Sequence, residues 1–504
     1  MMTDSIRVAL INPQGHVRWN NPPIAGHPDT GGQIVYILEL AKELALLGCK
    51  VDIFTRYFDD KDWPGYAERI ENHPKLENLR IVRITCGPED KFLNKEKLWP
   101  HIREYADGIS AFYRENEIKP DVVTSHYADG GLTAAILKKD LEVPFTHTGH
   151  SLGGQKIDNL EVTEKDFEEI NSRFEFGKRI SAERITFRNA HAIVTSTREE
   201  IEKQYGNKTY SGAVDNQEKF RIIPPGIDPS HFYSFREEEE DAEAYNSAVE
   251  KLKAEMKKNI DSDRADLPFV FSAARFDAKK NPAGLMRAYA SSKLLREKTN
   301  LMIIAGSVGN PLKEENRSKF NKNEQKIIDE LKEIIEENSL EGSVVVSPSF
   351  DFATEMPCLY RYTGTNGWTF VNPALHEPFG LTIVEAMASG LPVVATMHGG
   401  PSEILDGGKY GVLADSTSTD SLREGMEKLI EEGDWEKFSK DGVRRVLERF
   451  TWGSAAKGYL KLFKEISKQG ADFKNDYEIP EWFLNPSTSD ESSIDEELKN
   501  LYFI

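Results

Sequence analysis

Cysteine is scarce in this sequence. The 504 residues include three, Cys49, Cys86 and Cys358. No two of them have the spacing of a metal-binding or redox motif, so neither kind of sulfur site is expected. Scattered single cysteines are typical of proteins kept in a reducing compartment. We therefore expect three reduced thiols and a cytoplasmic protein.

Long apolar runs are also missing. No segment approaches the roughly 20 consecutive apolar residues that a membrane-spanning helix needs. Residues 1–8, Met-Met-Thr-Asp-Ser-Ile-Arg-Val, lack a basic region followed by an apolar stretch, so no secretory signal is predicted. We expect no membrane partner.

Positive charge is under-represented. Lys and Arg number 64 against 84 Asp and Glu, which gives a formal net charge of −20. Such a chain repels nucleic acid and anionic membranes at long range. We expect small-molecule substrates and no nucleic-acid partner. An anionic substrate would depend on a local cluster of Lys and Arg.

An Asp-x-Asp motif after a buried strand, which commonly binds the metal of a diphosphate substrate, is absent as well. Asp261-Ser262-Asp263 and Asp60-Lys61-Asp62 have the spacing, but both lie in polar segments. We expect no required metal or other cofactor.

Two large domains are the default at this length. Strand-like segments alternate with helix-like segments, which favours an α/β fold with parallel sheets covered by helices. The strands expected in the first half are 6–11, 51–55, 79–84, 121–126, 144–148, 192–196 and 220–223; those in the second half are 269–273, 301–306, 344–347, 369–373 and 391–396.

Two charged segments interrupt this pattern. The stretch 236–258 includes four consecutive glutamates and is expected to form a solvated helix or an insertion near the domain boundary. The tail from about residue 475 is rich in Ser, Asp and Glu, and we expect it to be only partly ordered.

Residues 376–390, His-Glu-Pro-Phe-Gly-Leu-Thr-Ile-Val-Glu-Ala-Met-Ala-Ser-Gly, form the most informative stretch. A tight turn at Gly380 would be followed by a helix with free backbone N–H groups at its start. If residues 381–389 are helical, Glu377 and Glu385 lie at most roughly 12 Å apart along the axis. That separation suits an extended ligand with hydroxyls at both ends and a negative middle.

The segment 271–282, Phe-Ser-Ala-Ala-Arg-Phe-Asp-Ala-Lys-Lys-Asn-Pro, places two cations after a buried strand. Arg275 follows the strand and Lys280 lies five residues later. Two fixed cations can neutralise a diphosphate leaving group and stabilise the charge that grows in the transition state. The alternative is an ordinary surface pair before a helix.

A loop of nineteen residues, 12–30, ends on Gly31-Gly32-Gln33, where a helix is predicted to begin. Loops of this length within a compact domain are often functional. Paired glycines let a ligand approach the backbone, and a helix N-terminus favours negative charge. A simple turn explains the two glycines equally well.

The segment 144–156, Pro-Phe-Thr-His-Thr-Gly-His-Ser-Leu-Gly-Gly-Gln-Lys, carries a strand into a glycine-rich loop. A single histidine such as His150 is more often structural. Ser151 and Lys156 in the same loop favour a binding site, in which His150 would hydrogen-bond a sugar rather than act as a base.

The Glu-x7-Glu pattern of 377–385 resembles the motif of retaining glycosyltransferases of family 4. The resemblance implies a GT-B fold, in which two Rossmann-like domains have parallel sheets that face a central cleft. It implies that Glu377 meets the donor sugar and that Glu385 meets the nucleotide ribose. Backbone N–H groups of Phe379, Gly380 and Leu381 would hold the sugar.

Other parts of the chain are similar to the same class. Arg275 and Lys280 match its Arg…Lys-Asn pattern and would stabilise the nucleoside diphosphate as it leaves. In that class the loop before Gly32 and Gln33 faces the donor diphosphate and the acceptor. The domains implied are an acceptor-binding domain, 1–235 joined by a segment from about 455 to 504, and a nucleotide-sugar-binding domain, 236–454.

Three segments narrow the resemblance to the sucrose-phosphate synthase family: 148–153 (Thr-Gly-His-Ser-Leu-Gly), 178–183 (Lys-Arg-Ile-Ser-Ala-Glu) and 125–131 (Ser-His-Tyr-Ala-Asp-Gly-Gly). They imply a phosphomonoester acceptor held by Lys156 and Arg179. Further residues implied on the acceptor side are Gly32, Gln33, Tyr127, Asp129 and Ser151, with Lys95 and Lys97 weaker candidates and Arg103 unassigned.

The activity implied is transfer of glucose from UDP-glucose to fructose 6-phosphate, giving sucrose 6-phosphate and UDP with retention at the glucose carbon. The family favours a front-face mechanism, although the residues alone are equally compatible with a double displacement. A phosphatase Asp-x-Asp-x-Thr motif is absent, so a separate sucrose-phosphate phosphatase is expected to act next.

Three alternatives stay open. The nearest is a related transferase of the same fold, such as a sucrose synthase or a mannosylfructose-phosphate synthase. A nucleotide-sugar 2-epimerase is a different class, for which Lys156 and Arg179 would have no use. A non-catalytic sugar-nucleotide binder is the third. Base preference and oligomeric state are not readable from the residues.

Overall fold

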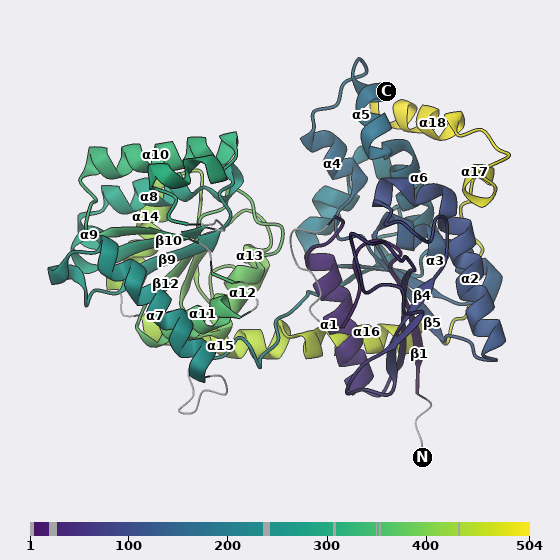
Figure 1. The fold of residues 1–504 in the computed structure, drawn as a ribbon, viewed down its shortest axis with the longest axis horizontal. Coiled ribbons are helices and arrows are strands. Elements are labelled where there is room, and N and C mark those ends of the chain that lie inside the picture. Colours follow the sequence, from purple (N-terminus) through teal and green to yellow (C-terminus); the bar gives the residue numbers. More distant parts are fainter. Residues whose placement is uncertain are drawn as a thin grey trace. The chain divides into compact units, whose positions relative to one another are not determined.

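The computed structural model describes residues 5–19, 28–234, 242–305, 309–348, 350–351, 354–431 and 434–503. The chain divides into two units (Figure 1). Unit 1 comprises Met1–Pro225 and Trp452–Ile504, and unit 2 comprises Gly226–Thr451. The boundary predicted between residues 235 and 236 falls outside the described residues. The chain was predicted to return to the first domain at about residue 455, and it re-enters unit 1 at Trp452.

Unit 1 contains an eight-stranded sheet in the order β3-β4-β2-β1-β5-β6-β7-β8. Its strands pair in parallel, except that the edge strand β3 is antiparallel to β4. The predicted strands are all present, and β3 was not predicted. Their bounds are β1 (Arg7–Ile11), β2 (Lys50–Arg56), β3 (Ile70–Asn72), β4 (Leu79–Ile84), β5 (Val122–His126), β6 (Phe145–Thr148), β7 (Ala192–Thr195) and β8 (Phe220–Ile222).

Helices cover both faces of this sheet, because side chains of a buried strand alternate between its faces. Val8 and Leu10 of β1 point into one core, and Ala9 and Ile11 point into the other. The first core is closed by α1 (Gly32–Leu46) and α16 (Trp452–Ile466), which pack on one another (Figure 1). The second face carries α2 (Ile102–Glu115), α3 (Tyr127–Leu141), α4 (Gly153–Asn159), α5 (Phe167–Phe174) and α6 (Phe176–Asn189).

Unit 2 contains a six-stranded parallel sheet in the order β11-β10-β9-β12-β13-β14. The strands expected in the second half are present, and β14 was not predicted. Their bounds are β9 (Phe269–Ala274), β10 (Asn300–Ala305), β11 (Val344–Ser347), β12 (Thr369–Asn372), β13 (Val393–Thr396) and β14 (Val412–Ala414).

Two apolar cores again lie on the two faces of the sheet of unit 2. One face packs against α8 (Pro282–Ser291), α9 (Lys293–Lys298), α10 (Lys322–Asn338) and α14 (Thr419–Glu431). The other packs against α7 (Ala242–Asn259), α11 (Glu355–Thr365), α12 (Leu381–Ala388) and α15 (Trp435–Arg449), and α13 (Pro401–Ile404) follows β13. Each unit is therefore a doubly wound α/β fold, as predicted.

The charged stretch near the boundary is more structured than expected. Helix α7 buries Ala248, Val249 and Leu252 against unit 2, so it is an amphipathic helix and not a fully solvated one. The glutamates 237–240 lie outside the described residues.

The expectation of an only partly ordered tail was wrong. The tail forms α17 (Glu481–Leu484) and α18 (Ser492–Phe503), and α18 packs along α6 (Figure 1). Ile494, Leu498 and Tyr502 recur every four residues and are buried on one face of the helix. The Tyr502 hydroxyl donates to Asp158 of α4 at 2.8 Å, so the tail holds α4 and α6 together.

No helix in the described part of the chain has both the length and the apolar character needed to cross a membrane.

Candidate active site

The predicted site residues follow the carboxyl ends of strands in both units. Tyr127 follows β5 and His150 follows β6 in unit 1, while Arg275 follows β9 and Glu377 follows β12 in unit 2. Ligands of open parallel sheets bind beyond these ends. The structure thus places these four residues at the edges of the sheets where a ligand is expected.

In unit 1, the loop after β6 is held by groups from α6 and the segment that follows β7. The Gly153 N–H donates to both oxygens of Glu183 at 3.0 Å, and the Gly154 N–H donates to the Tyr210 hydroxyl at 2.8 Å. A Cβ at Gly153 would lie 2.8 Å from Ile180, so only glycine allows α4 to pack this closely on α6. The glycines of this loop therefore serve packing.

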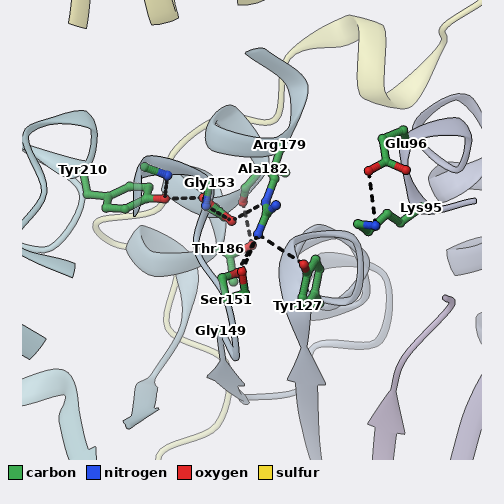
Figure 2. Close-up of polar contacts among 12 residues, drawn as sticks. Lys95, Glu96, Tyr127, Gly149, Ser151, Gly153, Arg179, Ala182, Thr186 and Tyr210 are labelled. Atoms are coloured by element: carbon green, nitrogen blue, oxygen red, sulfur yellow. Dashed lines mark hydrogen bonds and ion pairs between the residues drawn. The ribbon is translucent and has the colours of Figure 1, made fainter. Parts of the chain in front are cut away.

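Arg179 is the central cation of this site (Figure 2). Its side chain is 4% exposed, and Nη2 donates to the Ser151 carbonyl at 2.7 Å. Its guanidinium lies over the Tyr127 ring at 4.9 Å, and Nε donates to Glu183 at 3.1 Å. Burial alone would lower the pKa of Arg179, but the Glu183 carboxylate beside it raises that pKa above its ordinary value. The guanidinium is fixed and charged.

Lys156 is a second cation, without an ion pair in the described part of the chain. Its ammonium lies 3.9 Å from the centre of the Phe174 ring. Burial, together with repulsion from Arg179 and Lys95, lowers the pKa of Lys156 from 10.5 to about 8. Such repulsion shows a local positive field, which an anion would relieve.

A small recess lies beside Arg179 and Phe174. It is lined by Lys95, Glu96, Trp99, Tyr127, Ala128, Asp129, Phe174 and Arg179 and holds about 10 Å³, the space of one water. Burial raises the pKa of Asp129 to about 7. Neither oxygen of its carboxyl group has a hydrogen-bond partner among the described residues. A sugar phosphate would have to displace side chains to enter.

The other basic candidates differ in their pairing. Lys95 is already paired with Asp29, and with Glu96 at 3.2 Å (Figure 2). Lys97 is exposed. Arg103 forms ion pairs with two aspartates of its surroundings, so it stays unassigned.

His150 has a left-handed backbone with φ of 58° and lies against His126 of β5. His150 Nε2 and His126 Nδ1 are 2.8 Å apart. Burial lowers the pKa of His150 to about 4, so the ring is neutral at neutral pH. A neutral imidazole suits a hydrogen bond to a sugar.

The glycine pair at the start of α1 is open. An added Cβ at Gly32 would meet nothing within 4 Å, so its backbone is accessible to a ligand. Gln33 Nε2 is buried without a hydrogen-bond partner among the described residues. Both remain predicted acceptor-side residues.

In unit 2, Lys280 and Glu377 form an ion pair. Lys280 Nζ lies 2.7 Å from Glu377 Oε2, and Asn372 Nδ2 donates to the same oxygen at 3.2 Å. Arg275 is exposed and has no ion pair in the described chain. The two predicted phosphate-binding cations thus differ: one is neutralised by Glu377 and the other is available.

The turn after Glu377 is held against the start of α13. Gly400 N–H donates to the Glu377 carbonyl at 2.9 Å, and a Cβ at Gly399 would lie 2.0 Å from that oxygen. Gly380 has φ of 113°, which favours glycine at the start of α12. Neither Phe379 nor Gly380 donates its N–H to an acceptor in the described residues, and Leu381 begins the helix. These N–H groups are available to a ligand.

Glu385 differs from Glu377 in its surroundings. It is 3% exposed, and burial raises its pKa from 4.5 to about 8, with the nearby Tyr360 hydroxyl opposing that rise. Its Oε2 lacks a hydrogen-bond partner within the described chain. A ribose would supply such a partner.

Neither unit offers a metal site in the residues described: no group of three or more His, Cys, Asp or Glu side chains is arranged to hold a metal ion.

Several groups of the site were not predicted as site residues: His126, Phe174, Tyr210, Asn372 and Glu183. Of these, Glu183 carried a readable signal, because a glutamate four residues after an arginine on one helix can pair with it. Tyr210 comes from a segment that only the fold brings to the site, whereas His126, Phe174 and Asn372 lie within five positions of the predicted Tyr127, Arg179 and Glu377.

Comparison with known proteins agrees with this architecture. The model described as "Sucrose synthase first GT-B domain" matches residues 2–253, and "Glycosyl transferases group 1" matches residues 253–444. The solved sucrose-phosphate synthase of Thermosynechococcus elongatus superposes with a TM-score of 0.62 at 22% identity, covering 92% of this chain and 100% of that one. Anabaena HepE in complex with UDP-glucose gives 0.55 at 15%, covering 91% and 100%. The chain is a glycosyltransferase of the GT-B fold.

Curated relatives narrow the class further. A probable sucrose-phosphate synthase of Thermosipho melanesiensis is 35% identical over 461 residues, covering 91% of this chain and 97% of that one. The sucrose-phosphate synthase of Zea mays is 31% identical over 509 residues, and the chain spans 46% of its length. The chain belongs to the sucrose-phosphate synthase family and is a hexosyltransferase.

Proposed function

We propose that this enzyme transfers glucose from UDP-glucose to fructose 6-phosphate, with retention at the glucose carbon, and releases sucrose 6-phosphate and UDP. Unit 1 would bind the acceptor and unit 2 the donor. The observation that carries the choice of acceptor is the positive field of Lys156, which has no ion pair in the described residues and is repelled by the nearby Arg179. A neutral fructose would leave that field unused.

The acceptor phosphate would contact Lys156 and Arg179. Arg179 is a fixed, buried donor, whereas Lys156 is an ammonium resting on an aromatic ring and able to turn towards a ligand. Ser151 and Tyr127 already contact Arg179, and Lys95, which is paired with Asp29 and Glu96, lines the recess. Phosphate oxygens would then form charge-assisted hydrogen bonds. The acceptor-side N–H of Gly32 and amide of Gln33 would meet sugar hydroxyls.

The donor would replace contacts that unit 2 now makes internally. A diphosphate arriving at Lys280 and Arg275 would draw Lys280 from Glu377, leaving Glu377 to accept hydrogen bonds from sugar hydroxyls. The N–H groups of Phe379, Gly380 and Leu381 would donate to the sugar. Glu385 would accept from the ribose, which gives its buried carboxyl a hydrogen-bond partner.

We favour a front-face mechanism. Glu377 is paired with Lys280 and Asn372, which suits a binding role better than that of a nucleophile. The leaving phosphate oxygen would take the proton of the acceptor hydroxyl, while Arg275 and Lys280 stabilise the growing charge on UDP. His150, neutral and half-buried, would hold the transferred sugar.

The reaction is tested by following UDP release from UDP-glucose alone, with fructose and with fructose 6-phosphate. Release with the phosphate and not with fructose is expected. The opposite pattern would make the enzyme a sucrose synthase and refute the proposal. Isomerisation of a nucleotide sugar with no acceptor present would identify a 2-epimerase, and GDP-mannose used in preference to UDP-glucose a mannosylfructose-phosphate synthase.

We further propose that no metal or other cofactor is required. Turnover should survive treatment with a chelator; a loss that is restored by a divalent cation would refute this. The product is a sugar phosphate, so we propose that a separate sucrose-phosphate phosphatase acts next. The buried thiols of Cys49 and Cys86 support a cytoplasmic setting.

A further inference from the structure

Three histidines form a cluster at the carboxyl ends of β5 and β6, in which His126 and His147 are buried and His150 is half-buried. His126 ends β5, His147 lies in β6, and His150 follows β6. The rings of His126 and His150 are stacked with centroids 5.1 Å apart, and His126 Nδ1 lies 2.8 Å from His150 Nε2. Burial lowers the pKa of all three, so the rings are neutral at neutral pH.

A neutral imidazole carries its proton on one of its two nitrogens. A hydrogen bond between two such rings needs a proton on one of the facing nitrogens and a bare nitrogen opposite. Either His126 donates to His150 or the reverse. The direction of this hydrogen bond decides whether Nδ1, at the other edge of the His150 ring, carries a proton.

His147 shows which state a buried nitrogen adopts here when it lacks a partner. The Ser125 hydroxyl donates its single proton to the Thr146 carbonyl at 3.1 Å, so it can only accept from His147 Nδ1, which lies 3.0 Å away. The proton of His147 is therefore on Nδ1. Its Nε2 is bare, and it is buried without a partner in the described chain.

His126 Nε2 is in the same situation, being fully buried with no hydrogen-bond partner among the residues described. Orphaned buried N–H groups are rare in folded proteins, and burying one is costly. The proton of His126 therefore belongs on Nδ1, where it has an acceptor. His126 donates, and His150 Nε2 accepts.

We propose that His126 is a positioning residue that holds His150 in the tautomer with its proton on Nδ1. His150 Nδ1 has no partner within the described chain, and the Tyr36 ring, 4.9 Å away and edge-on, packs against the imidazole. His150 then presents an N–H and donates a hydrogen bond to an oxygen of the transferred sugar. In this tautomer Nδ1 of His150 already carries a proton and cannot accept another, so His150 does not act as a base. The inference rests on the proposed function for the identity of the ligand.

The tautomer is measured on the full chain without substrate, by ¹⁵N spectra of protein labelled at histidine, because the shift of each ring nitrogen shows whether it is protonated. A His150→Asn variant assigns the resonances. His150 is expected to carry its proton on Nδ1. A proton on Nε2 would overturn the inference, whatever the activity.

A matched pair of variants tests the cause. The amide nitrogen of asparagine lies two bonds from Cβ, as Nδ1 of histidine does, whereas that of glutamine lies three bonds away, as Nε2 does. His126→Asn can keep the donor and should retain the Nδ1 tautomer of His150. His126→Gln should lose it, with kcat/KM for UDP-glucose falling about tenfold, the worth of one hydrogen bond.

Equal losses in the two variants, with the His150 spectrum unchanged, would show that the His126 ring only fills space and would overturn the positioning role. Ser125→Ala, which removes the partner of His147, is the control and should leave the His150 resonances in place. If His126→Gln fails to fold, the spectrum of the natural protein still decides. If that spectrum shows the Nδ1 tautomer but UDP is not released with fructose 6-phosphate, the tautomer stands and the proposed function fails.

Discussion

Lys156 offers the most direct test of the acceptor site. The substitution Lys156→Met removes the ammonium and keeps an apolar stem on the Phe174 ring. Because Lys156 has no ion pair in the described residues, the change strands no buried carboxylate. Arg179→Ala would leave Glu183 without its cation, and loss of folding would then obscure the effect on binding.

The expected size follows from the contact that is lost. A hydrogen bond to a charged group contributes about 1.5–3 kcal/mol, which corresponds to a rise of about 10- to 150-fold in half-saturation by fructose 6-phosphate. Half-saturation by UDP-glucose should hardly change, because the predicted donor residues belong to unit 2. Thermal stability should be unchanged or slightly higher, since burial and repulsion disfavour the charge on Lys156.

The lowered pKa of Lys156 adds a second signature. Phosphate binding needs the protonated amine, and the pKa of about 8 means that the free enzyme loses this proton above pH 8. Affinity for fructose 6-phosphate should therefore fall as pH rises above about 8, and the Lys156→Met variant should lack this fall. The pH dependence of stability has the opposite sign to that of affinity. Between about pH 8 and 10.5 the unfolded chain holds a proton on Lys156 that the folded chain has released, so the free energy of unfolding rises with pH there.

The assay is the initial rate of UDP release over both substrates, from about pH 7 to about pH 9.5, a range that spans the lowered pKa. Lys165→Met is the matched control, because Lys165 is exposed, lacks an ion pair in the described chain and carries the same charge. It should leave both half-saturations unchanged. Equal increases for donor and acceptor in Lys156→Met, or a flat pH dependence in the natural enzyme, would refute the role assigned to Lys156.

Four further changes test other parts of the molecule. Glu377→Gln weakens the pair with Lys280 and should lower turnover about 10²- to 10³-fold in the UDP assay, with acceptor half-saturation nearly constant; a normal rate would contradict its role. Glu385 has its pKa raised from 4.5 to about 8, so the free energy of unfolding should fall as pH rises across that window. Glu385→Gln should abolish this dependence and raise the free energy of unfolding by on the order of 3 kcal/mol at pH 8 in denaturant titrations. Parallel curves of stability against pH for the variant and the natural enzyme would contradict the raised pKa. Gly399→Ala should cost roughly 2 kcal/mol or more and raise donor half-saturation, because its Cβ would meet the Glu377 carbonyl; unchanged thermal unfolding would exclude that clash. Leu498→Ala should loosen α18 and raise the half-saturation concentration of the acceptor about threefold while leaving that of the donor unchanged. An equal effect on both would show that the tail does not support the acceptor site.

The sequence predicted the strands of both sheets well where they are long and buried. β3 and β14 were missed because each has three residues and is incompletely buried, whereas the equally short β8 continues into Ile223 and so gives a longer apolar pattern. The tail was misjudged for a different reason. Its Ser/Asp/Glu content suggested disorder, while Ile494, Leu498 and Tyr502 at intervals of four already described one face of a helix.

The candidate site was predictable as far as its motifs extend. Arg179, Lys156, Lys280 and Glu377 lie in recognisable local patterns, and the structure places them at the carboxyl edges of the sheets. Their functional roles stay predictions. The contacts that fix them in place are mostly distant in the sequence: Tyr210 contacts Glu183 across 27 positions and Lys280 pairs with Glu377 across 97, whereas Asn372 lies five positions before Glu377. Tertiary packing decides such contacts.

The packing of α16 on α1 has a consequence for how the chain acquires its fold during synthesis. The hydroxyls of Tyr36 and Tyr459 lie 2.9 Å apart, yet 423 positions separate them in the sequence. At about 5–20 residues per second, a ribosome needs roughly 20 to 80 seconds to travel from one to the other. Until then the apolar side of α1 lacks its partner, while every residue of unit 2 has already been made. A nascent chain of this enzyme therefore completes its second unit before its first.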